Sequence, residues 1–206
     1  MNILHIDSSA SGAGSVSREL TASVVARLRA DRSDAVVTYR DLDATPPSHL
    51  GGALLAALRP QGNAAPPADA QRGELDVTET LLAEFLAADV IVVGAPMYNF
   101  SIPSQLKAWI DRLAQPGRTF RYTAAGPEGL VAGKRVVVVS SRGGLYAATP
   151  YETALDHQEA YLRAVFGFFG ISDIQIVRAE GVALGPDARA ASMQAALTQT
   201  RELTAA

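Results

Sequence analysis

The chain has 206 residues, of which 48% are hydrophobic and 19% are charged, and its formal net charge is −3. The high apolar fraction excludes a disordered chain, and the slightly acidic balance argues against a nucleic-acid-binding protein, which typically carries a basic patch. The sequence contains no cysteine, which excludes disulfides, thiolate catalysis and cysteine-ligated metal sites.

The sequence predicts neither a signal peptide nor a membrane span. The N-terminus reads MNILHID, without the basic region and long apolar stretch of a signal peptide. No run of 18 apolar residues is present, so no transmembrane helix is predicted. We therefore expect a soluble, cytoplasmic protein with neither a membrane nor a nucleic acid as its partner.

Short apolar runs alternate with segments of helical periodicity along the whole chain. The runs that predict strands lie at residues 3–6, 36–39, 90–93, 136–139 and 174–177. Apolar spacing of three and four residues predicts helices over residues 16–29, 75–88, 103–114, 152–169 and 187–204. The proline-rich segment 59–70 is expected to be a loop.

This alternation predicts a parallel β-sheet with helices on both faces, in a single domain spanning residues 1–206. The second and last strands mix polar with apolar residues and are expected at the edges. Residues 90–93 and 136–139 are entirely apolar, which indicates central strands buried on both faces. These features predict the strand order 2-1-3-4-5 of the flavodoxin-like, doubly wound α/β fold.

In such a sheet, ligands bind beyond the carboxyl ends of the strands, where the strand order reverses. The loops that follow the first, third and fourth strands meet there, and they read DSSASGAGSVS, GAPMYNFSIP and SSRGGLYAATP. Serine and glycine are common in ordinary turns, so each loop alone has a purely structural interpretation. Their occurrence in all three loops favours a pocket for a flat, phosphorylated cofactor.

The first loop is suited to binding a phosphate. Hydroxyl groups and the N–H groups at the start of a helix bind phosphate without lysine or arginine. The string Gly12-x-Gly14-x-x-Ser17 also approaches the dinucleotide fingerprint, with Asp41 as a ribose-binding acid. However, its glycines follow the strand at a distance and Ser17 replaces the third glycine, so a terminal monophosphate fits better.

The other two loops are suited to binding a planar ring. Tyr98 and Phe100 are placed to stack on a heterocycle, although aromatic residues also cap the ends of buried sheets. Gly143 and Gly144 allow the backbone to approach a ligand closely. Arg142 is either the positive charge that balances an anionic ligand or a solvated surface residue.

Side-chain catalysis has little support in this sequence. No G-x-S-x-G motif and no metal-ligand spacing is present, and His5 lies within a predicted strand. We therefore expect no metal and no catalytic side chain, with the chemistry supplied by an organic cofactor.

Several motifs together resemble the FMN-dependent NADH-azoreductase and NADH:quinone oxidoreductase family of bacteria, over essentially the whole chain. The resemblance starts with the serine-rich first loop and with APMYNF at residues 95–100, which continues into SQLK at residues 104–107. It extends through TFRYT (119–123), GPEGL (126–130), SRGG (141–144), GFFG (167–170) and AEGV (179–182).

The resemblance implies a homodimer with one FMN per subunit at the subunit interface. NADH or NADPH would reduce the flavin, and a quinone or an aromatic azo compound would then accept the electrons in a ping-pong reaction. By the family pattern, the FMN-binding residues are Ser9, Ser15, Val16, Ser17, Met97, Tyr98, Asn99, Phe100, Ser141, Arg142, Gly143 and Gly144. Position 16 is often polar in this family, so Val16 is expected to act through its backbone N–H.

Further residues are candidates for the substrate pocket. Phe120 and Tyr122 lie on one side of an extended segment, which forms either a flap over the flavin or a plain surface hairpin. Phe168 is a candidate either for a wall of the substrate pocket or for a partner-facing surface, and Trp109 for a partner-facing surface. Arg59 and Arg142 are candidates for a contact with a nucleotide 2′-phosphate. The main alternative function is a flavodoxin-type FMN electron carrier without organic substrate turnover, and a hydrolase is a more distant one.

Overall fold

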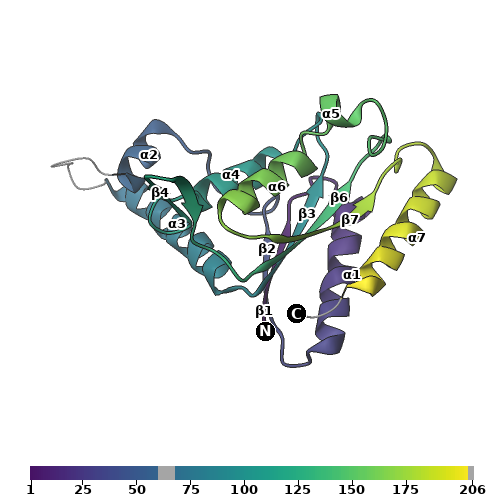
Figure 1. Cartoon of the computed structure of the whole chain (residues 1–206), viewed down its shortest axis with the longest axis horizontal. Helices are drawn as coiled ribbons and strands as arrows, with labels where there is room; N and C mark the ends of the chain where they lie inside the picture. The colour runs from purple at the N-terminus through teal and green to yellow at the C-terminus, as the bar shows by residue number, and fades with distance from the viewer. Residues whose placement is uncertain (60–67, 204–206) are drawn as a thin grey trace.

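The computed structural model describes residues 1–59 and 68–203, and it is built around one five-stranded sheet (Figure 1). All neighbouring strands pair in parallel, in the order β2-β1-β3-β6-β7. The strands are β1 (Asn2–Asp7), β2 (Val36–Asp41), β3 (Val90–Pro96), β6 (Arg135–Ser141) and β7 (Asp173–Ala179). The prediction of a flavodoxin-like sheet with its second and last strands at the edges is confirmed.

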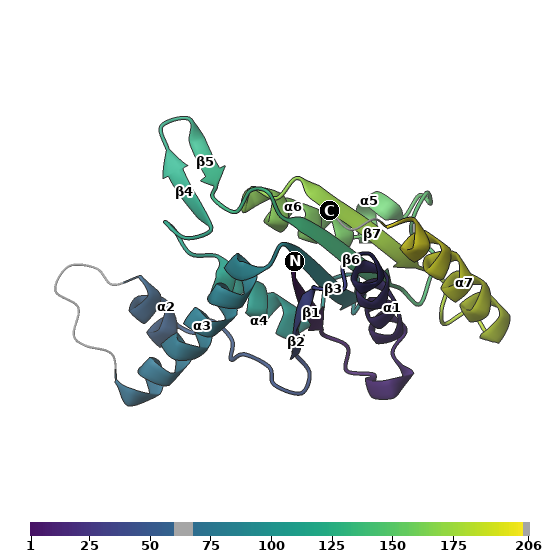
Figure 2. The ribbon, with the colours of Figure 1, turned by 90° about the horizontal axis from the view of Figure 1, so that it is seen from below.

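Helices cover both faces of this sheet (Figures 1 and 2). One face carries α1 (Val16–Asp31) and α7 (Pro186–Glu202), which pack on Val92 and Val139 of the sheet. The other face carries α3 (Asp69–Ala87), α4 (Ser104–Leu113) and α6 (Glu159–Phe168). The strands β3 and β6 lie between these two layers, which explains why their runs contain only apolar residues.

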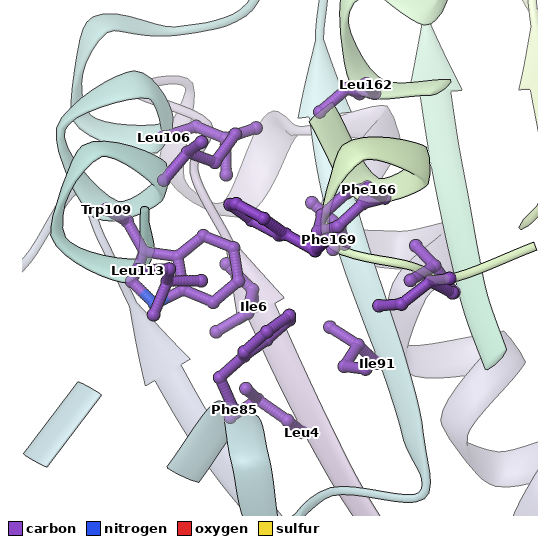
Figure 3. Close-up of a cluster of buried hydrophobic side chains, with 14 of the residues drawn as sticks. Leu4, Ile6, Phe85, Ile91, Leu106, Trp109, Leu113, Leu162, Phe166 and Phe169 are labelled. Carbon is purple, nitrogen blue, oxygen red and sulfur yellow. The ribbon is translucent and has the colours of Figure 1, made fainter. Parts of the chain in front are cut away.

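The core beneath α3, α4 and α6 is rich in aromatic side chains (Figure 3). The Trp109 ring packs edge-on against Phe85, with ring centroids 6.0 Å apart, and Phe85 also contacts Phe166 and Phe169. Trp109 is fully buried. Its prediction as a partner-facing residue is therefore wrong, because α4 turns this side chain toward the sheet.

The predicted helix over residues 152–169 is two helices, α5 (Glu152–Leu155) and α6. Asp156 breaks the run because its carboxylate accepts hydrogen bonds from the N–H groups of Gln158 and Glu159, at 3.2 and 3.0 Å. A side chain that bonds the backbone in this way begins a new helix. The sequence also did not predict α2 (Gly52–Leu58), and α3 begins six residues earlier than expected.

Two smaller elements complete the fold. A 3₁₀ turn, η1 (Gly12–Gly14), precedes α1, and Gly12 adopts a φ of 54°, which glycine tolerates without strain. The strands β4 (Phe120–Thr123) and β5 (Gly126–Gly129) form an antiparallel hairpin that projects away from the main sheet (Figure 2). Among residues 1–59 and 68–203, no helix combines the length and apolar character that spanning a bilayer requires.

Candidate functional site

The carboxyl ends of β1, β3 and β6 bring the three predicted loops together around a pocket of about 160 Å³. We call the loops after these strands loop 1, loop 3 and loop 4. Predicted residues that line this pocket are Ser9, Ser15, Val16, Met97, Tyr98, Ser141, Arg142 and Gly143. Asn99 lines a neighbouring pocket of about 430 Å³, and both pockets share Tyr98 as a wall.

Loop 1 presents donors at the start of α1. Ser15 caps this helix by accepting a hydrogen bond from the Arg18 N–H at 3.3 Å, and its hydroxyl lies 3.1 Å from that of Ser17. In the described part of the chain, no hydrogen bond engages the N–H groups of Val16 and Ser17. These two groups lie at the positive end of the helix dipole and are therefore available to an anion.

Loop 3 forms a tight turn between Tyr98 and Ser101, whose backbone groups exchange two hydrogen bonds of 2.9 and 3.1 Å. The two central residues, Asn99 and Phe100, have φ values of 49° and 71°. Asparagine tolerates this conformation, but phenylalanine rarely adopts it, so the turn stores strain. Phe100 is 44% exposed and follows Asn99, which lines the larger pocket.

Tyr98 links loop 3 to loop 1 across the pocket. Its hydroxyl accepts a hydrogen bond from the Ala10 N–H at 3.1 Å and lies 3.4 Å from the Ser9 hydroxyl. The tyrosine ring therefore forms the wall between the two pockets, with its apolar faces available for stacking.

Loop 4 offers the pocket a second set of backbone donors. The N–H groups of Gly143 and Gly144 make no hydrogen bond within the described residues, whereas their carbonyls accept from Ala183 and Gly181. A side chain added at Gly143 would bring its Cβ within 3.3 Å of the Ala183 Cβ. The backbone is thus held with its donors unengaged, which is the arrangement needed to stabilise a developing negative charge.

Arg142 is neither solvated nor free to balance a ligand's charge, so both interpretations of its side chain are wrong. Arg142 is 1% exposed, and its guanidinium forms ion pairs with Asp156 at 2.6 Å, Glu159 at 2.8 Å and Glu180 at 3.0 Å. A buried charge needs such compensation. Only the backbone of Arg142 can take part in binding, because the side chain is saturated by carboxylates.

The partners of Arg142 connect loops 3 and 4 to each other. Gln158 accepts hydrogen bonds from Arg142 and from Ser140, and its amide donates to the Ala95 carbonyl at the end of β3. Glu180 accepts from the N–H groups of residues 146 and 147. We call Arg142 and these partners (Asp156, Gln158, Glu159 and Glu180) the Arg142 network.

Arg18 and Asp41 form a second ion pair behind loop 1. The two side chains make a bidentate contact with two bonds of 2.7 Å, and the Arg18 guanidinium also donates to the Ser9 carbonyl at 2.9 Å. The hydrogen bond from Arg18 lowers the pKa of Asp41. Asp41 is therefore committed to Arg18 and not available to a ribose, which removes the main support for the dinucleotide fingerprint.

The residues predicted for the substrate pocket do not gather at the pocket of this chain. Phe120 is buried, with its ring 4.6 Å from that of Phe168, so both belong to the edge of the core. Tyr122 is 74% exposed on the hairpin, which projects on the side opposite α1 and α7 (Figure 2). Arg59 is exposed at the end of α2 and lines neither pocket.

Two pocket residues from the segment after β7 were not expected from the sequence. Val182 contributes an apolar wall beside loop 4, and Arg189 reaches the pocket from α7. Ser11, Gly14 and Pro96 also line the pocket, from loops that the sequence did identify. Val182 ends the AEGV motif (179–182) but was not singled out as a site residue, and Arg189 lies within α7, where no motif indicated it.

The donor set fits a ring that carries a phosphate. Unengaged N–H groups occur in three adjacent pairs, at residues 16–17, 99–100 and 143–144. The first pair lies at a helix N-terminus among serine hydroxyls and suits a phosphate, whereas the other two suit the polar edges of a heterocycle. FMN combines these two chemical parts.

Comparison with known proteins agrees with this fold. A family model described as "Flavodoxin-like fold" matches residues 1–203. A protein of Azospirillum brasilense named FMN-dependent NADH:quinone oxidoreductase is 56% identical over 196 residues, covering 95% of this chain and 94% of its own. A protein of the same name from Sinorhizobium fredii is 60% identical over 187 residues, covering 91% and 89%.

Solved structures of azoreductases share this fold. An FMN-dependent NADH-azoreductase from Bacillus anthracis, in complex with FMN, superposes with a TM-score of 0.88 at 28% identity, over 98% of this chain and 97% of that one. A second azoreductase from this species has a TM-score of 0.87 at 26% identity, over 98% and 100%. The chain therefore belongs to the flavodoxin-like fold family, and within it to the group whose members are named FMN-dependent NADH:quinone oxidoreductases.

Proposed function

We propose that this chain is an FMN-dependent oxidoreductase that uses NADH to reduce quinones and to cleave aromatic azo bonds. The observation that carries the proposal is that loops 1, 3 and 4, each with a pair of unengaged N–H groups, meet around two pockets that share Tyr98, in a chain 56% identical to a relative named for this activity. We further propose that residues 1–206 form one flavin-binding domain, which acts in the cytoplasm, where NADH is available.

Each loop has a distinct task in this proposal. Ser9, Ser15 and the N–H groups of residues 16–17 hold the FMN phosphate, and the side chains of Met97 and Tyr98 contact the ring. Bound FMN supplies hydride transfer between NADH and the acceptor. The N–H groups at Asn99 and Phe100 hold one edge of the ring, and those at loop 4 stabilise negative charge at the opposite edge.

We propose a homodimer as the working assembly. Three apolar side chains on the loops that follow β3 and β6, Phe100, Leu145 and Tyr151, are 44%, 58% and 61% exposed, and exposed apolar side chains on neighbouring loops favour an interaction surface. The projecting hairpin, with Tyr122 exposed, is a second apolar feature without cover in its own chain. Sedimentation equilibrium tests this part, and a monomer at micromolar concentration would contradict it.

The first experiment is an absorption spectrum of the protein supplied with FMN, before and after NADH is added without air. We expect flavin bands that bleach with NADH and return when a benzoquinone is added. Bound flavin that NADH does not bleach would favour the electron carrier, and no bound flavin would contradict the site. Steady-state kinetics should give parallel double-reciprocal lines, since donor and acceptor use the same pocket in turn.

A further inference from the structure

The helix α7 brings one arginine to the phosphate end of the pocket. Arg189 is half-buried and lines the same wall as Ser9, Ser15 and Val16. Its guanidinium donates a 3.2 Å hydrogen bond to the carbonyl of Gly14, the residue just before the cap of α1. The charge therefore lies beside the loop whose N–H groups are available to an anion.

Arg189 is the pocket's uncompensated positive charge. Arg18 behind loop 1 is paired with Asp41, and Arg142 is paired with three carboxylates. In residues 1–59 and 68–203, by contrast, no carboxylate lies within ion-pair distance of Arg189, and no acidic side chain lines the pocket. An anion that enters this end of the pocket meets one cation that is free to pair with it.

The position of Arg189 within α7 also favours a role in binding an anion. It is the fourth residue of the helix, close to the positive end of the helix dipole, where a cation is unfavourable. Arg201, in the last turn of the same helix, occupies the end that favours a cation. The helix dipole does not stabilise a positive charge at this position, so the charge of Arg189 departs from local preference in the way that functional residues do.

We propose that Arg189 pairs with the phosphate of the bound flavin and makes the pocket selective for FMN over unphosphorylated riboflavin. The inference rests on the proposed function. The planar fork of a guanidinium matches the oxygens of a phosphate, which Arg189 reaches by exchanging its one bond to a neutral carbonyl for charge-assisted bonds.

The test is a fluorescence titration of the flavin-free protein with FMN and, separately, with riboflavin. We expect Arg189→Ala to weaken FMN binding roughly tenfold, the value for a charge-assisted contact that is partly exposed, and riboflavin binding less than twofold. Arg189→Lys should lose less FMN affinity than Arg189→Ala. The FMN affinity of Arg189→Ala should also fall less steeply with added salt.

Arg201→Ala is the matched control, because it removes the same charge from the same helix, about 18 Å further along its axis. It should leave both affinities unchanged. The flavin-free Arg189→Ala protein should melt at or above the wild-type temperature, since a cation near the helix N-terminus is lost.

Three outcomes would overturn the proposal or its basis. Equal losses of FMN and riboflavin affinity in Arg189→Ala would show that Arg189 acts on the pocket's structure and not on the phosphate. Unchanged FMN affinity in that variant would show that it makes no contact. A wild-type protein that binds neither flavin would overturn the proposed function itself.

Discussion

Replacing Arg142 by methionine should cost more stability than replacing any exposed arginine. The substitution keeps an apolar stem of similar length but leaves Asp156, Glu159 and Glu180 buried or nearly buried without their shared cation. Removing one partner of a buried ion pair costs about 3–5 kcal/mol, because the remaining charge stays desolvated. For a domain of this size, that lowers the melting temperature by about 10 °C.

The loss of stability in Arg142→Met should depend on pH, in a direction that follows from the pKa of Glu159. Burial raises the pKa of Glu159, but the hydrogen bond from Arg178 and the charge of Arg142 outweigh it, so the net shift is downward. A carboxyl with a lowered folded pKa stabilises the protein above its unfolded pKa and loses this contribution as the pH falls through the folded value. Without Arg142, one of the interactions that lower the pKa of Glu159 is lost while its burial remains, so we expect this pKa to be higher in the variant than in wild type. The ionised carboxylate then stabilises the variant less at high pH, and the difference in stability from wild type should narrow as the pH falls from 8 to 5 and below.

Urea unfolding of the flavin-free proteins at pH 8, 7 and 5, followed by circular dichroism, measures this difference. The matched control is Arg121→Met, which breaks the exposed pair with Glu128 on the hairpin and should have no measurable effect. Arg142→Met with a stability within about 1 kcal/mol of wild type at pH 8 would refute the reasoning. If the difference in unfolding free energy between wild type and Arg142→Met grows from pH 8 to pH 5, the predicted direction of the pH dependence is refuted.

Two backbone positions give further predictions. Phe100→Gly removes a side chain at a φ of 71° and should raise the free energy of unfolding of the flavin-free protein in urea by about 1 kcal/mol. The same change should loosen the loop proposed to contact the flavin ring. A urea midpoint below that of wild type would contradict the assigned strain. Gly94→Ala places a Cβ 2.9 Å from the Asp7 carboxylate and should destabilise the protein by about 1–3 kcal/mol. Its control is Gly73→Ala, a helical position with open space, which should gain up to about 1 kcal/mol.

The sheet was predictable because its signal is local. Residues 90–93 and 136–139 are buried on both faces, so each run shows its central position in its own composition. The sheet order then placed three loops at one edge, and the pocket is lined by residues of all three. No contact between distant residues had to be known for this inference.

The side-chain environment of Arg142 was not predictable, since its partners lie 14 to 38 residues away in the sequence. The same tertiary network explains the misplaced helix over residues 152–169. Asp156 lies within an apolar repeat of helical spacing, yet its carboxylate serves Arg142 and caps α6. Periodicity reports which face of a helix is buried, but not which polar side chain interrupts it.

Arg189 shows a further limit of the same kind. The sequence predicted a helix over residues 187–204, of which residue 204 lies outside the described residues, and α7 spans Pro186–Glu202, but helix prediction does not say which surface residue faces another loop. Only the packing of α7 beside α1 brings this arginine to Gly14, 175 residues away. No sequence motif therefore indicated the charge that we assign to phosphate recognition.

If the Arg142 network holds the flavin loops in place, Arg142→Met should also bind FMN more weakly, although its side chain does not reach the ligand. A ligand at 100 times its Kd stabilises a protein by about 2.7 kcal/mol, and a tenfold weaker Kd at the same concentration reduces this to about 1.4 kcal/mol. Unfolding with and without FMN should thus show about half the wild-type ligand stabilisation in the variant. Equal stabilisation of both proteins would mean that Gln158 and Glu180 position loops 3 and 4 without Arg142, and that the buried arginine serves the fold alone.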